Sequence, residues 1–303
     1  MKILVTGAHG MIGRNLVKVL SDQEYELLTP TIMQLDLRIL KDIDEYLSFH
    51  KPDMIVHLAS IVGSVHDKEL NPYTYLSENI SIDNNILNAA YKNDIKKLIN
   101  ISSLLIYSNQ KSKLHRENSI IKSDSIYLTE NPYAASKILT LKLCNSLYKQ
   151  NNQFRFISLI PCSVFGYHDN YDAEKSHFIA SSIRKIHNNL TGVVNIWGDG
   201  KAYREVIFAE DFAKIISNVI QKYDQLPSLI NVGSGTFMKI SEYYEEIGRV
   251  LGYKGRFEFD ITRPSGTTIN KMDSTVLLKH IPFRFTKFSD AIEKTYQDFI
   301  QNR

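Results

Sequence analysis

The sequence predicts an α/β fold built on a doubly wound parallel sheet, with a smaller, discontinuous carboxy-terminal lobe. Over the first half of the chain, short apolar runs alternate with stretches of helical apolar spacing at the intervals of strand–helix–strand units. Beyond Gly166 this alternation weakens. We therefore expect a first domain over residues 1–165 and a lobe mainly over 166–303, with the chain returning to the first domain at about 206–235.

Composition and charge exclude several classes of protein. With 303 residues, 43% of them hydrophobic and 23% charged, the chain can bury an ordinary core and shows no sign of disorder. The net charge of +3 is spread along the chain, so no basic block predicts nucleic-acid binding. No apolar stretch approaches the length of about 18 residues that a membrane span needs, and the amino terminus does not resemble a secretion signal. The two cysteines, Cys144 and Cys162, cannot by themselves form a disulfide framework or a zinc site. We expect a cytoplasmic protein without a bound metal.

The first predicted strand, residues 2–6, runs directly into a glycine-rich turn. Gly7, Gly10 and Gly13 follow the strand with the spacing Gly-x-x-Gly-x-x-Gly, and residues 14–20 then show helical apolar spacing. Glycines permit a tight turn and let a pyrophosphate approach the amino terminus of the helix, where free N–H groups favour an anion. The sequence therefore predicts a dinucleotide site at the start of the chain.

The second predicted strand, residues 25–28, ends without the residue that usually selects the cofactor. An acidic residue there would bind the ribose 2′-hydroxyl of NAD, and an arginine would receive the 2′-phosphate of NADP. The chain continues through residues 29–32 with neither, so the choice stays open on these grounds. Asp36 and Leu37 follow, and Asp36 is interpreted either as a contact to the adenine amine or as the cap of the next helix.

Two further apolar runs end in small or hydroxyl residues. Residues 54–60 form a strand whose small end suits a backbone lying against the cofactor, and His57 within it is interpreted as a satisfied buried histidine. Residues 97–103 form the next strand and close with two serines. These strand ends are expected at the same edge of the parallel sheet as the glycine turn.

Tyr133 and Lys137 lie four residues apart on a helix that opens at residues 131–132. Positions i and i+4 of a helix lie one above the other. The lysine can hold positive charge near the phenol, which favours tyrosinate and lowers a phenol pKa of about 10 toward the range of a working proton donor. The pair predicts acid chemistry on a carbonyl or alcohol.

Three motifs together resemble one family. The glycine turn, the segment 102–107 with the sequence Ser-Ser-Leu-Leu-Ile-Tyr, and Tyr133-x-x-x-Lys137 are similar to those of extended short-chain dehydrogenases/reductases that act on nucleotide sugars. Within that superfamily the chain resembles the GDP-L-fucose synthases over nearly its full length. These are Rossmann-fold enzymes that use NADPH to epimerise GDP-4-keto-6-deoxymannose at C3 and C5 and then reduce C4. The likeness is clearest over residues 131–149, 166–170, 175–177, 197–200, 204–205 and 252–255.

The resemblance implies roles for individual residues. Ser103 is expected to hydrogen-bond the substrate C4 oxygen, Tyr133 to protonate that oxygen, and Lys137 to bind the nicotinamide ribose and support the tyrosine charge. The expected contacts to the nucleotide diphosphate are Lys185, Trp197 and Arg204. The expected contacts to the cofactor are Gly7, His9, Gly10, Met11, Ile12, Gly13, Asp36, Leu37, Leu58, Ala59, Ser60, Lys137, Pro161 and Val164.

One departure from the family concerns the epimerisation base. The family's catalytic cysteine falls on Leu105, which has no ionisable group, while the histidine that acts with it falls on His177. Neither Cys144 nor Cys162 stands at an obviously equivalent place. The sequence therefore predicts a dedicated 4-ketoreductase of a GDP-linked deoxyhexose or heptose, with His177 as an acid without its base or as a binding contact.

Further departures concern the cofactor and the sugar. The family's arginines for the 2′-phosphate fall on His9 and Ile32. NADPH is still the expected cofactor, because the acidic residue that selects NAD is also absent, and Arg14 or a nearby lysine is the candidate replacement; NADH is the alternative. Residues 264–270 lack the family's acidic residue and basic pair, which leaves the sugar open.

Several alternatives remain. The chain could be a bifunctional epimerase/reductase, a nucleotide-sugar 4-epimerase or, least expected, a non-catalytic dinucleotide sensor, although such sensors usually lose the tyrosine or the lysine. A dehydratase would add acidic residues after the serine, where Leu104 and Leu105 stand. The wide apolar faces of the helices at 79–91 and 132–149 predict a homodimer through a four-helix bundle, and a stripe facing the sheet explains them nearly as well.

Overall fold

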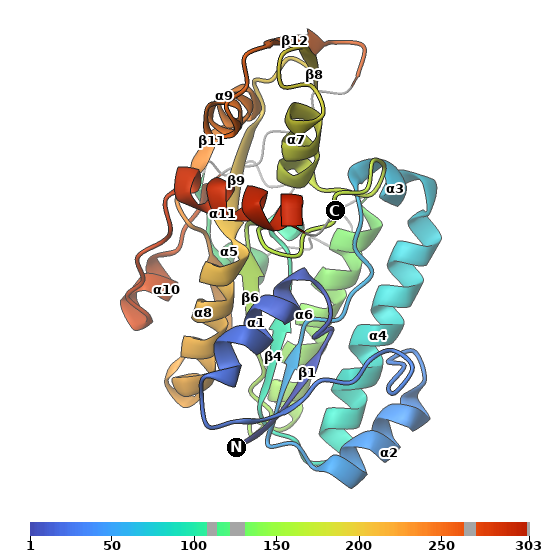
Figure 1. The fold of residues 1–303 in the computed structure, drawn as a ribbon. Coiled ribbons are helices and arrows are strands. Elements are labelled where there is room, and N and C mark those ends of the chain that lie inside the picture. Colours follow the sequence, from blue (N-terminus) through green and yellow to red (C-terminus); the bar gives the residue numbers. More distant parts are fainter. Residues whose placement is uncertain (108–113, 122–130, 264–270, 302–303) are drawn as a thin grey trace.

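A parallel sheet of six strands forms the centre of the molecule in the computed structural model, which describes residues 1–107, 114–121, 131–263 and 271–301 (Figure 1). The strand order is β10-β6-β4-β3-β1-β2, and every neighbouring pair is parallel. The predicted α/β fold with a parallel sheet is confirmed. The strands are β1 (Lys2–Thr6), β2 (Glu26–Leu28), β3 (Met54–His57), β4 (Leu98–Ile101), β6 (Ile157–Pro161) and β10 (Leu229–Val232).

Helices cover both faces of this sheet, which explains why its strands are apolar runs rather than alternating ones. On one face α1 (Met11–Ser21) packs against α8 (Ala209–Gln221), and on the other α4 (Pro72–Lys92) packs against both α2 (Leu40–His50) and α6 (Pro132–Gln150). Side chains along β1 point alternately to the two faces of the sheet: Ile3 and Val5 belong to one buried apolar cluster and Leu4 to the other.

The order of the strands places a crevice at the start of the chain. β1 lies between β2 and β3, so the chain moves outward on one side of β1 and then crosses to the other. Thr6, the last residue of β1, lies opposite His57, the last residue of β3. Ligands of doubly wound sheets bind at such a switch point, beyond the carboxyl ends of the strands.

The second lobe lies above the carboxyl edge of the sheet in Figure 1 and has an apolar cluster of its own. Its strands are β7 (Ser163–Phe165), β9 (Tyr203–Phe208) and β11 (Phe237–Lys239) in one sheet, and β8 (Val193–Trp197) with β12 (Arg256–Asp260) in another. Its helices are α7 (Phe178–His187), α9 (Ile240–Leu251) and α11 (Phe288–Gln301). Between these segments the chain supplies α8 and β10 to the main body. The boundaries at 165 and 206–235 remain predictions.

Short elements complete the description. They are α3 (Val65–Leu70), η1 (Leu104–Tyr107), β5 (Leu114–His115), α5 (Glu117–Ile121), η3 (Tyr223–Gln225), β13 (Lys271–Met272) and α10 (Thr275–His280). The helix predicted from residue 79 begins at Pro72, a residue suited to a first helical turn because its missing N–H is not needed there. None of the described helices has the length and apolar character that crossing a membrane requires.

Candidate active site

The tyrosine and lysine predicted to do the chemistry lie in the first turns of α6. The side chain of Asn131 accepts a hydrogen bond from the Ala134 N–H at 3.0 Å, and Pro132 occupies the first turn, so the helix starts immediately before the pair. Tyr133 is 8% exposed and Lys137 is 2% exposed. The Lys137 Nζ lies 5.8 Å from the centroid of the Tyr133 ring. The helix thus presents a buried cation beside the phenol.

A second cation, which the sequence did not single out, lies closer to the same ring. The Nζ of Lys68, from α3, is 4.8 Å from the Tyr133 centroid. This side chain is 9% exposed, and no carboxylate in the described residues lies within ion-pair distance of it. Burial therefore lowers its pKa to about 8. Lys68 was missed because it stands outside every motif, 65 residues from Tyr133 along the chain.

His177 belongs to the same neighbourhood. It is the residue before α7, and its pKa is lowered to about 4 by burial first and then by the positive charge of Lys68. The imidazole is therefore neutral at physiological pH. A neutral ring can accept or donate a hydrogen bond, but it is a weak proton donor compared with an imidazolium. This favours the predicted role of His177 as a binding contact over its role as an acid.

The serine motif lies against the helix that carries the tyrosine. Ser103 follows β4, and its Oγ accepts a hydrogen bond from the Leu105 N–H at 3.3 Å at the start of η1. The short helix η1 packs against α6. Both Ser103 and Leu105 are partly exposed, so a hydroxyl and an aliphatic side chain are available next to the tyrosine helix.

Neither cysteine can replace the missing base. Cys144 lies in α6 but packs into the apolar cluster shared with α2 and α4, and Cys162 lies in the cluster on the opposite face of the sheet. Both thiols are free and buried. Burial raises the pKa of Cys144 to about 12 and that of Cys162 well above its usual value, so both stay protonated.

The glycine turn has the shape of a pyrophosphate cradle. Gly7 has φ +67°, and a Cβ on Gly13 would lie 2.1 Å from the Gly7 carbonyl oxygen, so neither position accepts a side chain. Helix α1 begins after Gly10 with no side-chain cap and no acidic residue in its first turn. The first turn of α1 therefore brings no anion of its own to the N–H groups around Met11 and Ile12, and a dinucleotide fits there.

The end of β3 forms the other wall of this crevice. A Cβ on Gly7 would lie 2.7 Å from the Ala59 nitrogen, so the two backbones are in contact. The Leu58 N–H donates to the Thr6 carbonyl at 3.2 Å, and the Ser60 hydroxyl donates to Asn79 at 2.7 Å. Pro161 is the last residue of β6 in the same sheet, and Val164 lies in β7, which belongs to the sheet of β9 and β11; both remain predicted cofactor contacts.

His9, Arg14 and Asp36 are expected at the outer end of the crevice, where the adenosine half of the cofactor is predicted to lie. The His9 Nε2 lies 3.1 Å from the Thr29 carbonyl oxygen, and the exposed Arg14 donates from Nε to the His9 carbonyl at 3.0 Å. Asp36 is bound by Arg38 through Nε–Oδ1 at 2.9 Å, and this pairing lowers the pKa of the carboxyl. Asp36 is not a helix cap, because α2 begins at Leu40 after Ile39 and has no side-chain cap. Leu37, the next residue, is buried.

The predicted diphosphate contacts lie in the second lobe. The Lys185 Nζ is 5.0 Å from the Trp197 ring centroid and donates to the Asn195 carbonyl at 3.0 Å. The guanidinium carbon of Arg263 lies 5.2 Å from the same ring, and Trp197 is 52% exposed. A large exposed indole with two cations suits a base and phosphates. Arg263 was missed from the sequence; the altered segment 264–270 that follows it lies outside the described residues.

Arg204 does not lie on the same elements as Lys185 and Trp197. It lies on β9, where its Nη1 donates to the Tyr203 carbonyl at 2.8 Å and burial lowers the pKa of the guanidinium. Lys185 and Trp197 lie on α7 and β8. The structure therefore brings Lys185 and Trp197 together, whereas Arg204 lies in a different sheet and its predicted role as a diphosphate contact stays a prediction.

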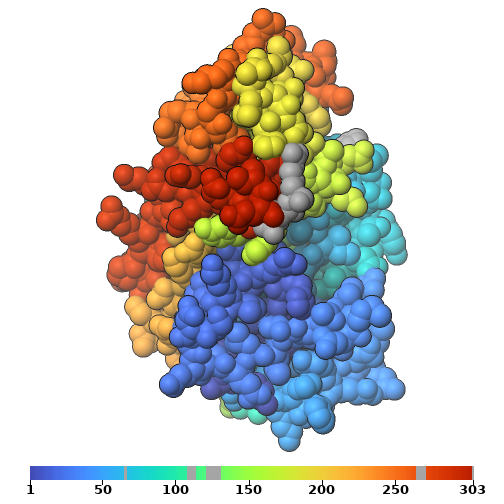
Figure 2. All heavy atoms as spheres, viewed as in Figure 1, coloured from blue at the N-terminus to red at the C-terminus, as the bar shows by residue number. Residues whose placement is uncertain are grey.

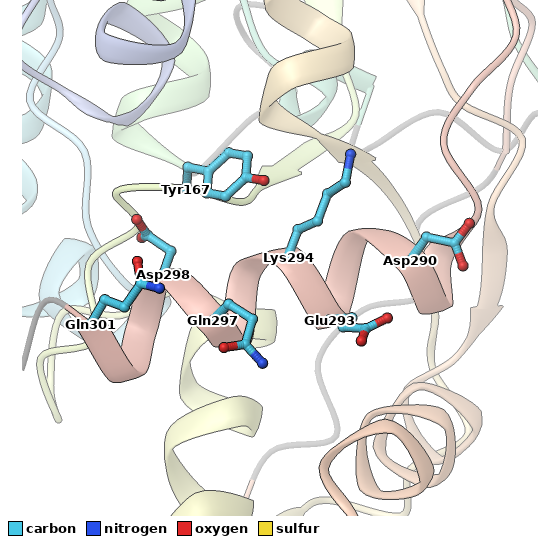
Figure 3. Close-up of a pocket in the computed structure, with 7 residues that line it drawn as sticks. All are labelled: Tyr167, Asp290, Glu293, Lys294, Gln297, Asp298 and Gln301. Carbon is cyan, nitrogen blue, oxygen red and sulfur yellow. The ribbon is translucent and has the colours of Figure 1, made fainter.

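A surface hollow of about 480 Å³ is lined by none of the predicted site residues (Figure 3). It runs along α11, which crosses the face of the molecule seen in Figure 2. Its lining is Tyr167, Asp290, Glu293, Lys294, Gln297, Asp298 and Gln301. Three carboxylates against one ammonium make this hollow unsuited to an anionic nucleotide, so it is not the candidate site.

Comparison with known proteins identifies the family of the chain. A family model described as the NAD dependent epimerase/dehydratase family matches residues 3–233. GDP-L-colitose synthase of Yersinia pseudotuberculosis is 38% identical over 306 aligned positions, covering 100% of this chain and 99% of that protein. GDP-L-fucose synthase of Azorhizobium caulinodans is 36% identical, with 99% and 96% covered. A GDP-6-OMe-4-keto-L-xylo-heptose reductase of C. jejuni has the same fold, with a TM-score of 0.90 at 22% identity and 100% and 98% covered. The chain belongs to the NAD dependent epimerase/dehydratase family.

Proposed function

We propose that this protein is an NADPH-dependent reductase of the C4 carbonyl of a GDP-linked 4-keto sugar, and that it reduces without epimerising C3 or C5. The observation that carries the proposal is Leu105, an aliphatic side chain beside Ser103 and the tyrosine helix where the resembling family has its catalytic cysteine. The two relatives named above carry GDP-sugar synthase names, and they span nearly the whole chain. These names support a GDP-linked sugar, and the substrate class that we propose is a GDP-linked deoxyhexose or heptose.

The side chains divide the reaction among them. The dinucleotide, when bound in the glycine crevice, supplies the hydride that adds to C4. Tyr133 donates its phenolic proton to the C4 oxygen as the carbonyl becomes an alcohol, and Ser103 orients that oxygen by a hydrogen bond. Lys137 holds the nicotinamide ribose and keeps positive charge near the phenolate that remains. Lys68 adds a second positive charge over the same ring.

A panel of GDP-4-keto sugars with NADPH tests the proposal. We expect loss of absorbance at the NADPH band in proportion to alcohol formed, with one configuration at C4 and unchanged C3 and C5 by NMR. A nucleotide-sugar 4-epimerase would interconvert the alcohols with no net consumption of cofactor. Interconversion without cofactor consumption would contradict the proposal. Turnover of UDP-linked sugars alone would contradict it as well.

Deuterium exchange separates simple reduction from the bifunctional alternative. In heavy water without reduced cofactor, we expect a GDP-4-keto-6-deoxymannose substrate to take up no deuterium at C3 or C5. One observation favours the alternative function, a bifunctional 3,5-epimerase/4-reductase: the buried Lys68 amine beside His177 has a pKa of about 8 and could act as a base. Uptake that disappears in Lys68→Met would identify Lys68 as the base and refute reduction alone; Lys142→Met, on α6 outside the site, is the control.

The cofactor preference depends on the outer end of the crevice. Arg14 is exposed and lies beside His9, so its guanidinium is the nearest candidate for a 2′-phosphate. We expect Arg14→Ala to weaken NADPH binding about tenfold, worth roughly 1.4 kcal/mol, while leaving NADH binding within about twofold. Fluorescence titration with both cofactors measures this. A parent enzyme that prefers NADH would contradict the choice of NADPH.

Helices α4 and α6 are proposed to pair with their counterparts in a second copy. They pack side by side and expose apolar side chains, among them Tyr73 at 80%, Leu143 at 39% and Tyr148 at 41%. We expect a dimer in sedimentation equilibrium and a monomer for Leu143→Arg, with Lys142→Ala as the control. A monomeric parent would overturn this. We place the enzyme in the cytoplasm, consistent with its two free, buried cysteines.

A further inference from the structure

We propose that Asp83 is a positioning residue: its carboxylate, held by His57 and Thr140, fixes the Lys137 ammonium in place and keeps it charged for cofactor binding. The role of Lys137 toward the cofactor rests on the function proposed above. The inference adds a buried hydrogen-bonded chain that connects this lysine to the strand leading into the glycine turn.

The contacts of Asp83 are all to donors. Lys137 Nζ lies 3.1 Å from Oδ2 and 3.4 Å from Oδ1, His57 Nε2 lies 3.0 Å from Oδ1, and the Thr140 hydroxyl donates to Oδ2 at 2.5 Å. Asp83 and Lys137 are 1% and 2% exposed. Three donors from two other elements therefore hold one carboxylate, and that carboxylate is the anion facing the buried ammonium.

The series of hydrogen bonds continues from Asp83 to the cofactor crevice. Because a carboxylate accepts hydrogen bonds, the His57 Nε2 carries a proton and donates it to Asp83, and the other ring nitrogen, Nδ1, lies 2.8 Å from the Thr6 hydroxyl. Thr6 precedes Gly7, and its Oγ1 accepts from the Ala59 N–H at 3.4 Å. The two strand ends that wall the crevice are thus tied to the lysine through His57 and Asp83.

Because Lys137 is buried, its positive charge depends on the Asp83 carboxylate. Desolvation alone would lower the pKa of Lys137, but the Asp83 carboxylate and the nearby Tyr133 raise it above its ordinary value. Within the described part of the chain, the other ionisable groups around the pair are His57 on β3, Cys144 on α6, whose thiol stays protonated, and Lys68, which packs on the Tyr133 ring. Removing the charge of Asp83 would leave the ammonium buried without a counter-ion.

Asp83→Asn tests the inference, because asparagine keeps the shape and removes the charge. In the parent, the Lys137 ammonium stays charged up to about pH 9, so we expect no change in NADPH affinity from its titration below that pH. In the variant, the ammonium loses its proton at lower pH, so affinity should fall about tenfold or more between pH 7 and pH 9. NADPH fluorescence titration measures this. The control is Asp224→Asn, which removes the same charge from the exposed ion pair with Lys97.

The same pH dependence in parent and Asp83→Asn would overturn the inference, even if the variant were less stable, because a structural role alone would not shift the titration. If Asp83→Asn does not fold, the inference is tested by comparing Lys137→Met with the double variant Lys137→Met/Asp83→Asn. In a Lys137→Met background the orphaned ammonium is absent, and adding Asp83→Asn should not weaken NADPH binding by more than about twofold. A further loss there would show that Asp83 acts on the cofactor independently of Lys137, and would also overturn the inference.

These measurements separate the two proposals. They report cofactor binding and need no sugar substrate, so a failure to reduce any GDP-4-keto sugar would count against the proposed function alone. A pH-independent affinity of Asp83→Asn in an enzyme that does reduce such a sugar would count against the inference alone.

Discussion

Replacing Tyr133 by phenylalanine should lower kcat by about 10²- to 10⁴-fold, the range in which a positioned general acid contributes. Phenylalanine keeps the ring on which Lys68 packs at 4.8 Å and removes only the hydroxyl that protonates the C4 oxygen. NADPH affinity should therefore stay within about twofold, because the glycine turn and Lys137 are unchanged. Steady-state loss of NADPH absorbance and a separate binding titration measure the two quantities.

Tyr148→Phe is the matched control for this change. Tyr148 lies on the same helix, is 41% exposed and has no role in the proposed chemistry, so its hydroxyl should be dispensable. Retention of more than a tenth of parental kcat in Tyr133→Phe would show that another group donates the proton. In that case Lys68 would be the first residue to replace, since its ammonium lies next to the ring.

Lys137→Met should have the second large effect, on stability as well as on activity. Methionine leaves the Asp83 carboxylate buried without its cation, and breaking a buried pair from one side costs about 3–5 kcal/mol. Cofactor binding should weaken as well, because the proposed ribose contact is lost. Urea unfolding at pH 7 measures the stability change. The control Lys92→Met breaks the exposed pair with Asp44 and should cost less than about 1 kcal/mol.

The destabilisation by Lys137→Met should depend on pH with a definite sign. In the parent, burial would raise the pKa of Asp83, but the Lys137 charge and the hydrogen-bond donors outweigh it and lower that pKa to about 2. The stability from Asp83 is therefore complete above the unfolded pKa near 3.8 and is lost as pH falls toward 2. In the variant, burial without the cation raises that pKa, and acid relieves the buried charge by protonating it. The gap between parent and variant should therefore shrink from pH 7 to pH 5. A constant gap would show that Asp83 does not carry the effect.

The sequence by itself determined the fold class, and it paired the two residues that we propose at the centre of the site. Apolar runs at βαβ spacing predicted the parallel sheet, because strands buried on both faces must be apolar throughout. The glycine spacing from Gly7 to Gly13 predicted the cradle, since the turn excludes a Cβ at both ends. Tyr133 and Lys137 could be paired because helix geometry brings positions i and i+4 together without any tertiary information.

Only the tertiary structure decided what surrounds that pair. Lys68 approaches Tyr133 from α3, Asp83 approaches Lys137 from α4, and Arg263 reaches the Trp197 ring from beyond β12. Each of these contacts joins residues at least 54 positions apart, and no local periodicity encodes such a distance. A buried charge is compensated by whichever partner packing brings within a few ångströms, and that partner becomes visible only once the helices are placed on the sheet.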